Sequence, residues 1–233
     1  MRRSITTAFV ASLIAVALLA GCGGGKKARQ LSVAQIVGET TAKTAEVKSF
    51  HFVLKVEHPA PSTSGLSLTY ANGDVIVPDK LKADVAGTLS GVSLKSSLVI
   101  IGATAFVKDP FSGRWQKVDV KTSPVGFLDP AKGVLAVIKG SIRLALTGSA
   151  TVDGVDCYVL RGKVPARALT AILGNPPSGR LANVALDIGK SDSLLRGIRL
   201  SGPIAASEPT NIAREVDVSR FDEKVSIEAP QAA

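Results

Sequence analysis

Apolar residues follow a helical period in one stretch near the start of the chain. They recur every three or four residues, as Val33, Ile36, Val37, Thr40, Thr44 and Val47. Ser32, followed three residues later by Gln35, forms the capping-box pattern that marks a helix N-terminus. The spacing therefore predicts one amphipathic helix from about residue 32 to residue 48.

From Phe50 onward, apolar residues alternate with polar ones, as in strands that bury one face. Such runs cover about residues 50–56, 81–89, 92–100, 142–146, 184–188, 194–200 and 216–218. Turn signals separate them, namely Asn72-Gly73, Pro78-Asp79, Ser112-Gly113, Asp153-Gly154 and residues 190–193. Roughly ten short strands with short turns predict a meandering antiparallel sheet.

An antiparallel sheet with one apolar face needs cover, and two short apolar segments can supply it. One opens at Asp129-Pro130 and continues through Val134, Leu135, Val137 and Ile138. The other begins at Pro165, carries Ala166, Leu169, Ile172 and Leu173 on one stripe, and stops at Pro176-Pro177. No linker divides residues 32–233, so a single domain is expected there.

The first residues have the pattern of a lipoprotein signal. Arg2 and Arg3 precede an apolar run over residues 8–20, which is shorter than the roughly 20 residues that a membrane span needs. The run ends in Leu-Ala-Gly-Cys22, which looks like a bacterial lipobox. We expect residues 1–21 to be the signal peptide and residues 22–31 to be an acylated Cys22 with a flexible tether. An ordinary secretory signal that contains a cysteine is the alternative.

Composition excludes several classes of partner and chemistry. Lys and Arg number 28 against 19 Asp and Glu, giving a charge of +9, but they are dispersed, and aromatics make up only 4%, so nucleic acid is not expected as a partner. The charge serves either solubility or attraction to anionic headgroups. His51 and His58 lack ligand-like spacing, so we expect no metal and no other cofactor. Cys157 is expected to be a buried strand residue.

Catalytic signatures are also missing from the sequence. It contains neither a G-x-S-x-G elbow nor an S-x-x-K pair, and carboxylates such as Asp79, Asp84 and Asp187 show no pairing. We therefore expect no enzyme. A hydrolase would need a triad assembled only in three dimensions, with Ser or Asp beside His51 or His58.

Several segments occur in an order typical of one family. They are GDVIVPDKLKA at 73–83, GRW at 113–115, FLDP at 127–130, DGVDCYVLRGKVP at 153–165 and FDEKV at 221–225. Over about residues 32–230 the chain resembles the mycobacterial LppX/LprAFG lipoproteins. The resemblance implies an α+β, mostly β, LolA-like fold: a strongly curved, half-closed antiparallel sheet with a few helices on its concave face.

In that family an apolar cavity takes up the acyl chains of envelope lipids or lipoglycans. The protein then carries the lipid away from the cytoplasmic membrane, in some members alongside a membrane transporter. The physical mechanism is partition, since exposing acyl chains to water costs about 25 cal/mol per Å². Candidate cavity residues are Leu54, Val56, Leu98, Ile100, Leu135, Leu144, Leu146, Leu169, Ile172 and Leu186, with Phe106, Trp115 and Tyr158 as weaker candidates. For each residue, ordinary core packing is the alternative, because periodicity does not separate a filled core from a hollow one.

The resemblance thus predicts a monomeric carrier without chemistry, held through acylated Cys22 on the extracytoplasmic face of the cell membrane or displayed further out in the envelope. Its ligand would be an envelope lipid or lipoglycan. The alternative is an envelope protein-interaction or sensor module, since LolA-like folds also bind polypeptides. A hydrolase is a third hypothesis.

Overall fold

The computed structural model describes residues 31–60, 67–119, 130–170 and 178–231, and Leu31–Ala233 form one compact unit. The predicted signal peptide, Cys22 and Ile172 lie outside the described residues. The helices are α1 (Val33–Glu46), α2 (Pro130–Gly140) and the short 3-10 helix η2 (Ala166–Leu169). The strands are β1 (Ser49–Glu57), β2 (Ser67–Ile76), β3 (Lys80–Leu89), β4 (Val92–Ile101), β5 (Thr104–Lys108), β6 (Trp115–Asp119), β7 (Ile142–Val152), β8 (Val155–Pro165), β9 (Leu181–Gly189), β10 (Leu195–Ser201) and β11 (Ala213–Ser219).

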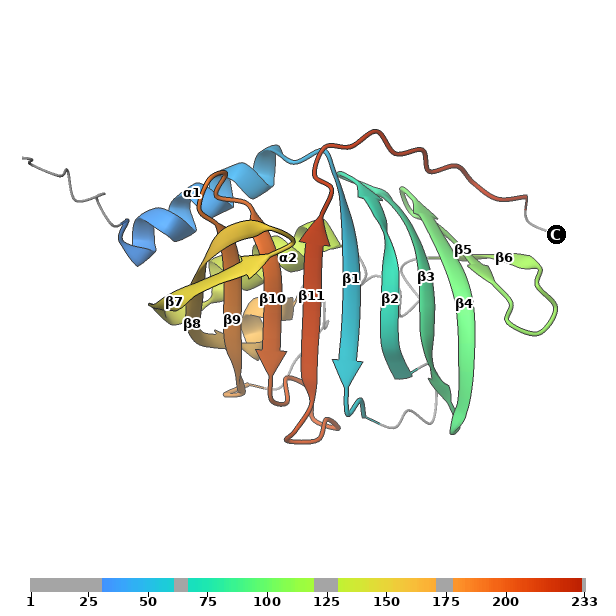
Figure 1. The fold of residues 1–233 in the computed structure, drawn as a ribbon. Helices are drawn as coiled ribbons and strands as arrows, with labels where there is room; N and C mark the ends of the chain where they lie inside the picture. Colours follow the sequence, from blue (N-terminus) through green and yellow to red (C-terminus); the bar gives the residue numbers. More distant parts are fainter. Residues whose placement is uncertain (1–30, 61–66, 120–129, 171–177, 232–233) are drawn as a thin grey trace, which may run out of the picture. The chain divides into compact units, whose positions relative to one another are not determined.

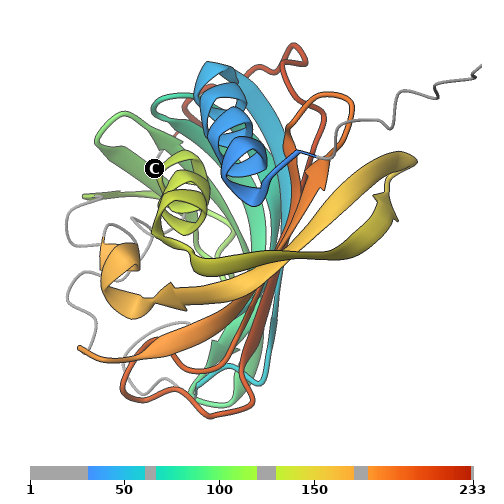
Figure 2. The ribbon, with the colours of Figure 1, turned by 90° about the vertical axis from the view of Figure 1, so that its left-hand side faces the viewer.

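The eleven strands of the described residues form one antiparallel sheet in the order β6-β5-β4-β3-β2-β1-β11-β10-β9-β8-β7. The chain runs outward from β1 to the edge strand β6, passes through α2 to the opposite edge at β7, and returns inward to β11. Strand β11 then pairs with β1 in the middle of the sheet, although these strands lie at opposite ends of the domain sequence (Figure 1). The sheet is strongly curved and unclosed, which confirms the predicted mostly-β half-barrel (Figure 2).

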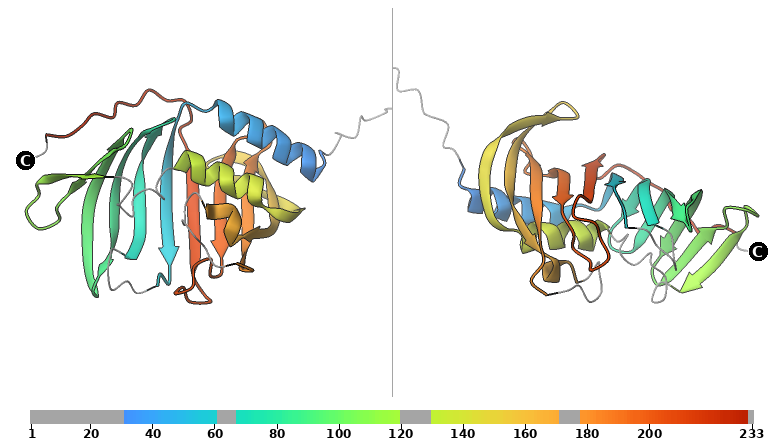
Figure 3. Two further views of the ribbon diagram at one scale, coloured as in Figure 1. Left: turned by 180° about the vertical axis from the view of Figure 1, so that it is seen from behind. Right: turned by 90° about the horizontal axis from the view of Figure 1, so that it is seen from below.

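The helices lie on the concave side of the sheet, over one half of it (Figure 3). Helix α1 contacts α2 and β7, while α2 also contacts η2 and β8. The predicted capping box is present, because Ser32 Oγ accepts a hydrogen bond from the Gln35 amide at 3.3 Å and Gln35 Oε1 accepts one from the Ser32 amide at 2.9 Å. The helix predicted after Pro165 is a 3-10 helix over Ala166–Leu169 in the described residues.

Buried apolar residues form two clusters on the concave side. The first joins α1, α2 and η2 to strands β8, β9 and β10, and we call it the helix-covered cluster; examples are Ile36, Ile138 and Leu186. The second consists of residues from β1–β5 and β11 together with Val47, and we call it the strand-only cluster; examples are Phe52 and Leu98. The domain therefore has two unlike halves that meet along β1 and β11.

Three details differ from the sequence prediction. Asn72-Gly73 is not a turn but lies inside β2, where a Cβ on Gly73 would come within 2.2 Å of the Lys82 carbonyl oxygen. Glycine there permits the close approach of β3 that a strongly curved sheet requires. Val92 shares the apolar parity of its strand but is exposed at the hairpin end. A bulge in β10 places Leu195, rather than Leu194, among the buried residues.

Candidate functional site

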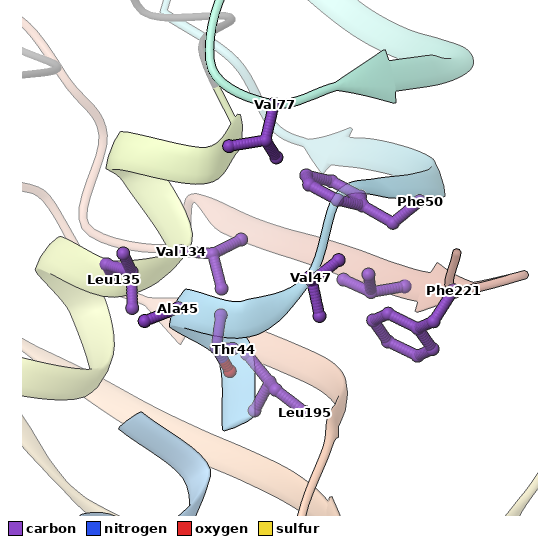
Figure 4. Close-up of a pocket in the computed structure, with 10 residues that line it drawn as sticks. Thr44, Ala45, Val47, Phe50, Val77, Val134, Leu135, Leu195 and Phe221 are labelled. Atoms are coloured by element: carbon purple, nitrogen blue, oxygen red, sulfur yellow. The ribbon is translucent and has the colours of Figure 1, made fainter. Parts of the chain in front are cut away.

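A small apolar pocket lies where the two clusters meet (Figure 4). Its volume is about 60 Å³, and it is lined by Thr44, Ala45, Val47, Phe50, Val77, Val134, Leu135, Leu195, Val218 and Phe221. These residues come from the end of α1, from α2, from the top of β1, β10 and β11, and from two connecting segments. Val134 and Leu195 belong to the helix-covered cluster, whereas Val47, Phe50 and Val218 belong to the strand-only cluster. The pocket thus bridges the two halves.

Backbone hydrogen bonds fix the pocket wall where α1 passes into β1. Val47, which follows α1, is extended, so the chain enters β1 directly and Phe50 faces the concave side. The Lys48 carbonyl accepts a hydrogen bond from the Val77 amide at 2.8 Å. The Lys48 amide donates to Asp222 Oδ1 at 2.6 Å. The connections after α1, β2 and β11 are therefore tied together around the pocket.

The lining contains one side-chain hydroxyl. Thr44 Oγ1 is buried and has no hydrogen-bond partner among the described residues. A buried hydroxyl without a partner costs stability in proportion to its lost hydration. The lining that the structure describes is otherwise hydrocarbon, which suits an apolar ligand, and among these residues no group is suited to chemistry.

Below the pocket, three cross-strand pairs run along the middle of the concave face. The pairs are Phe52 with Val218, Leu54 with Val216, and Val56 with Arg214, and we call this strip the seam. Leu54, Val56 and Val216 are only half-buried. Val216 packs against both clusters. The seam is therefore the border between the two halves, with the pocket at its upper end.

The lower end of the seam is charged. Arg214 pairs with Glu208, and their side chains are only 18% and 11% exposed. Glu208 Oε2 accepts hydrogen bonds from the amides of Ile204 and Ala205, at 2.7 and 3.0 Å. Burial lowers the pKa of Arg214, while the Glu208 carboxylate acts in the opposite direction. The pair thereby holds the β10–β11 loop against the end of the strip.

The structure distributes the predicted cavity residues instead of gathering them in one cavity. Leu135 lines the pocket, and Leu54 and Val56 lie on the seam. Leu98 and Ile100 are buried in the strand-only cluster. Leu169 and Leu186 are fully buried in the helix-covered cluster, against which the half-buried Leu144, Leu146 and Tyr158 pack.

The weaker candidates Phe106 and Trp115 do not belong to the concave face. Phe106 is opposite Val99 in the register, whereas its neighbour Val107 is opposite the buried Leu98. Trp115 is opposite Lys108, which has the same parity as Phe106. Both aromatic residues therefore point to the convex side, because side chains alternate between the two faces of a strand.

Sequence reasoning missed most of the pocket lining. Phe50, Val134 and Val218 stand in apolar runs that were recognised, so their parity was available as a signal. Val77 and Phe221 lie in connecting segments without periodicity, and only the long-range pairing of β1 with β11 brings them to the pocket.

The third hypothesis, a hydrolase, requires Ser or Asp beside a histidine, and His51 on the convex face has both residue types nearby. His51 Nδ1 lies 2.7 Å from Asp74 Oδ1, and Ser219 stands opposite His51 in the register. However, Arg220 contacts both His51 and Asp74, no hydrogen bond joins Ser219 to His51, and these residues do not line the pocket. This polar cluster joins β1, β2 and the residue that follows β11, and it lacks the nucleophile–base contact of a triad.

Cys157 is buried as predicted, and burial raises the pKa of its thiol. An open groove of about 720 Å³ lies over β2–β5 and the following hairpin, beside Tyr70, Lys95 and Phe111. Within the described residues there is no cluster of three or more His, Cys, Asp or Glu suited to a metal ion. None of the helices in the described part of the chain is long and apolar enough to span a membrane.

Comparison with known proteins gives consistent matches. Residues 32–227 match the family model described as LppX_LprAFG lipoprotein. The lipoarabinomannan carrier protein LprG of Mycobacterium tuberculosis strain H37Rv is 30% identical over 166 residues, which is 68% of this chain and 69% of that protein. The protein of the same name from Mycobacteroides abscessus is 28% identical over 179 residues, 75% and 76% of the two chains.

Two solved structures share the fold. LprF from Mycobacterium bovis superimposes with a TM-score of 0.65 at 18% identity, covering 85% of this chain and 96% of that one. Mycobacterium tuberculosis LppX gives a TM-score of 0.60 at 19% identity, covering 84% and 100%.

Proposed function

The chain belongs to the LppX_LprAFG lipoprotein family, and from that premise we propose that it binds the acyl chains of envelope lipids or lipoglycans and carries them without chemical change. The observation that carries the proposal is the apolar pocket at the junction of the two halves, continued by the half-buried seam. The similarity to proteins named lipoarabinomannan carrier supports it.

The proposal includes the anchoring of the protein. Residues 1–21 would be removed, Cys22 acylated, and the domain from residue 32 onward held by the tether on the extracytoplasmic face of the membrane. Each buried methylene of the acyl chains contributes about 0.8 kcal/mol, so two or more chains give a lasting anchor.

Ligand uptake requires the pocket to enlarge. A volume of about 60 Å³ is well below the roughly 300–1,000 Å³ of typical small-molecule sites. Helix α2 supplies Val134 and Leu135 to one wall, while β1 and β11 supply the other. We place the acyl chain between them along the seam, where it displaces α2 outward and replaces helix–sheet contacts by chain–sheet contacts of the same apolar kind.

Native mass spectrometry on the chain from residue 22 onward, with Cys22→Ala, tests the proposal. After secretion from a mycobacterial host, the wild-type domain is expected to retain a stoichiometric acyl lipid. Leu54→Trp would fill the seam and abolish retention. Val53→Trp is the matched control, because Val53 is the next residue on the same strand and faces the convex side; it is expected to retain the lipid.

The decisive contrary outcome is a wild-type domain that stays free of lipid even after incubation with envelope lipids. A Leu54→Trp protein that folds and binds as well as wild type would contradict the placement on the seam. Leu146→Trp asks whether the site extends across the helix-covered half to β7, in which case this variant also loses the lipid.

A further inference from the structure

Arg214 is a charged residue on the otherwise apolar concave face of the central strand β11. Its neighbours in the register are Val56 on β1 and Leu200 on β10, and the same face of β11 carries Val216 and Val218. Val218, at the pocket, is four positions along β11 from Arg214, a distance of about 13 Å along the strand. The concave face therefore has a hydrocarbon end and a cationic end.

One side of the Arg214 guanidinium is already used. Nη2 donates to Glu208 Oε1, and Glu208 is in turn held by the two amides of Ile204 and Ala205. These three donors spread the charge of the carboxylate, so Glu208 is well satisfied within the loop. The contact between Arg214 and Glu208 holds the β10–β11 loop in place, but it does not involve Nη1, the other terminal nitrogen of the guanidinium.

The other nitrogen, Nη1, is buried and has no hydrogen-bond partner among the described residues. A buried charged group with unsatisfied N–H donors is costly, and a guanidinium is shaped to bind phosphate oxygens through its parallel N–H groups. Nη1 lies at the end of the strip proposed for the acyl chain but is itself covered, so an anion reaches it only when the bound ligand displaces the groups that cover it. A ligand that brings an anion to this end in that way would satisfy Nη1.

We propose that Arg214 binds the phosphodiester of an anionic acyl lipid, so that the ligands of this protein are phosphate-bearing lipids rather than neutral glycerides. This inference rests on the proposed function. The acyl chains lie along the seam toward the pocket, and the phosphate sits beside the β10–β11 loop, where the partial exposure of Arg214 leaves the rest of the headgroup access to solvent.

Competition between two lipids that differ only at the headgroup tests the assignment. The domain from residue 22 with Cys22→Ala is equilibrated in detergent with equimolar dioleoylphosphatidylglycerol and dioleoylglycerol, and bound lipid is read by native mass spectrometry. The wild type is expected to prefer phosphatidylglycerol. Arg214→Lys keeps a cation for Glu208 but removes Nη1, and should lower that preference by about tenfold to a hundredfold, the value of a charge-assisted hydrogen bond.

Two further variants separate recognition from folding. Glu208→Gln frees the whole guanidinium and should raise the preference for phosphatidylglycerol, which a purely structural role of the pair does not predict. Arg199→Lys is the matched control, because Arg199 pairs with Glu215 on the adjacent strand but on the convex face, with an Nη2–Oε2 distance of 2.6 Å. It should leave the preference unchanged.

The outcomes separate the two claims. If no lipid of either kind is retained, the proposed function fails. If both lipids are retained and Arg214→Lys keeps the wild-type preference, the function stands and the assignment of Arg214 is wrong. Inorganic phosphate that binds in an Arg214-dependent way and displaces phosphatidylglycerol at equal concentration would overturn the lipid assignment in favour of a free-phosphate site.

Discussion

The two halves of the sheet use the same antiparallel register but bury their concave faces differently. Behind the helices, Leu186 of β9 is flanked by Leu160 and Ile198, all of them large and buried. In the strand-only cluster, Leu98 of β4 is flanked by Ala83 and Val107, one small and one only partly buried. At these two positions the helix-covered half packs large branched side chains next to one another. The strand-only half, although it also buries Phe50 and Phe52, places a small residue beside Leu98.

The difference extends to the most deeply buried side chains. Ile36, Ile138, Leu160, Leu169 and Leu186 all lie in the helix-covered cluster. In the strand-only cluster Ala71 and Ala105 are the residues below 2% exposed, and its large side chains Phe52 and Leu98 are 2% and 3% exposed. The helix-covered half therefore holds the most completely buried large side chains, and we expect it to contribute more to the stability of the domain.

Truncating the same side chain in each half gives the largest expected effect. Leu186→Ala removes a fully buried side chain between two large neighbours and should lower the free energy of unfolding by about 3–5 kcal/mol. Leu98→Ala should cost about 2–3 kcal/mol, since its small neighbours lose fewer contacts. Chemical denaturation of the two variants measures both values.

Lipid retention provides the second readout for this pair. Leu98 on β4 and Leu186 on β9 both lie away from the seam proposed for the acyl chain, so both variants should retain lipid and differ in stability alone. Equal losses of stability in the two variants would remove the distinction between a tightly packed half and a less tightly packed one.

The period of the apolar residues predicted α1 and the longer strands with regular alternation, together with the face that each of them buries. It located α1 through Ser32 and Gln35, and it placed Leu98 and Leu186 on the concave side of their strands. The short strand β5 and the short edge strand β6 were absent from the predicted runs, since five residues carry too few alternations to be recognised.

The site itself depends on pairing that no local pattern encodes. The pocket exists because β11 returns to β1 and because α2 crosses between the two edge strands. One signal was nevertheless present in the sequence: Arg214 interrupts the apolar parity of Val216 and Val218. A charged residue on a buried parity is a reason to look for a partner, and here it has one in Glu208.

A smaller effect on stability is expected at Thr44, which lines the pocket between the two halves. Thr44→Val replaces the unpartnered hydroxyl of the pocket by a methyl group of similar size, and should raise the free energy of unfolding by about 1 kcal/mol. Helix propensity does not offset this gain, because Thr and Val are similar in helices. Thermal or urea denaturation of the lipid-free domain measures it.

The neighbouring turn of α1 supplies the control. Thr40 Oγ1 is buried but donates to the Ile36 carbonyl at 2.8 Å, so Thr40→Val should cost about 0.5–1.5 kcal/mol instead. A loss of stability in Thr44→Val would mean that the hydroxyl is hydrated, and that the pocket is wet rather than apolar.

The smallest expected effect lies on the convex face of β9, behind the helix-covered half, at Asp187. Burial raises the pKa of Asp187, and Asp217 nearby adds to the shift, while Arg199 and Arg161 lower it in part. The folded state therefore holds the proton of Asp187 more tightly than the unfolded chain, in which the carboxyl has its ordinary pKa of 3.8. Ionisation above the folded pKa weakens the fold.

Asp187→Asn should raise stability at pH 7 by less than about 1 kcal/mol, since solvent screens this half-exposed site. Denaturation midpoints should converge with wild type as the pH falls below the unfolded pKa, whereas Asp79→Asn at an exposed turn should leave the midpoint unchanged throughout. A gain in stability that persists at low pH would instead reflect packing of the new amide, and would mean that the charge of Asp187 does not weaken the fold.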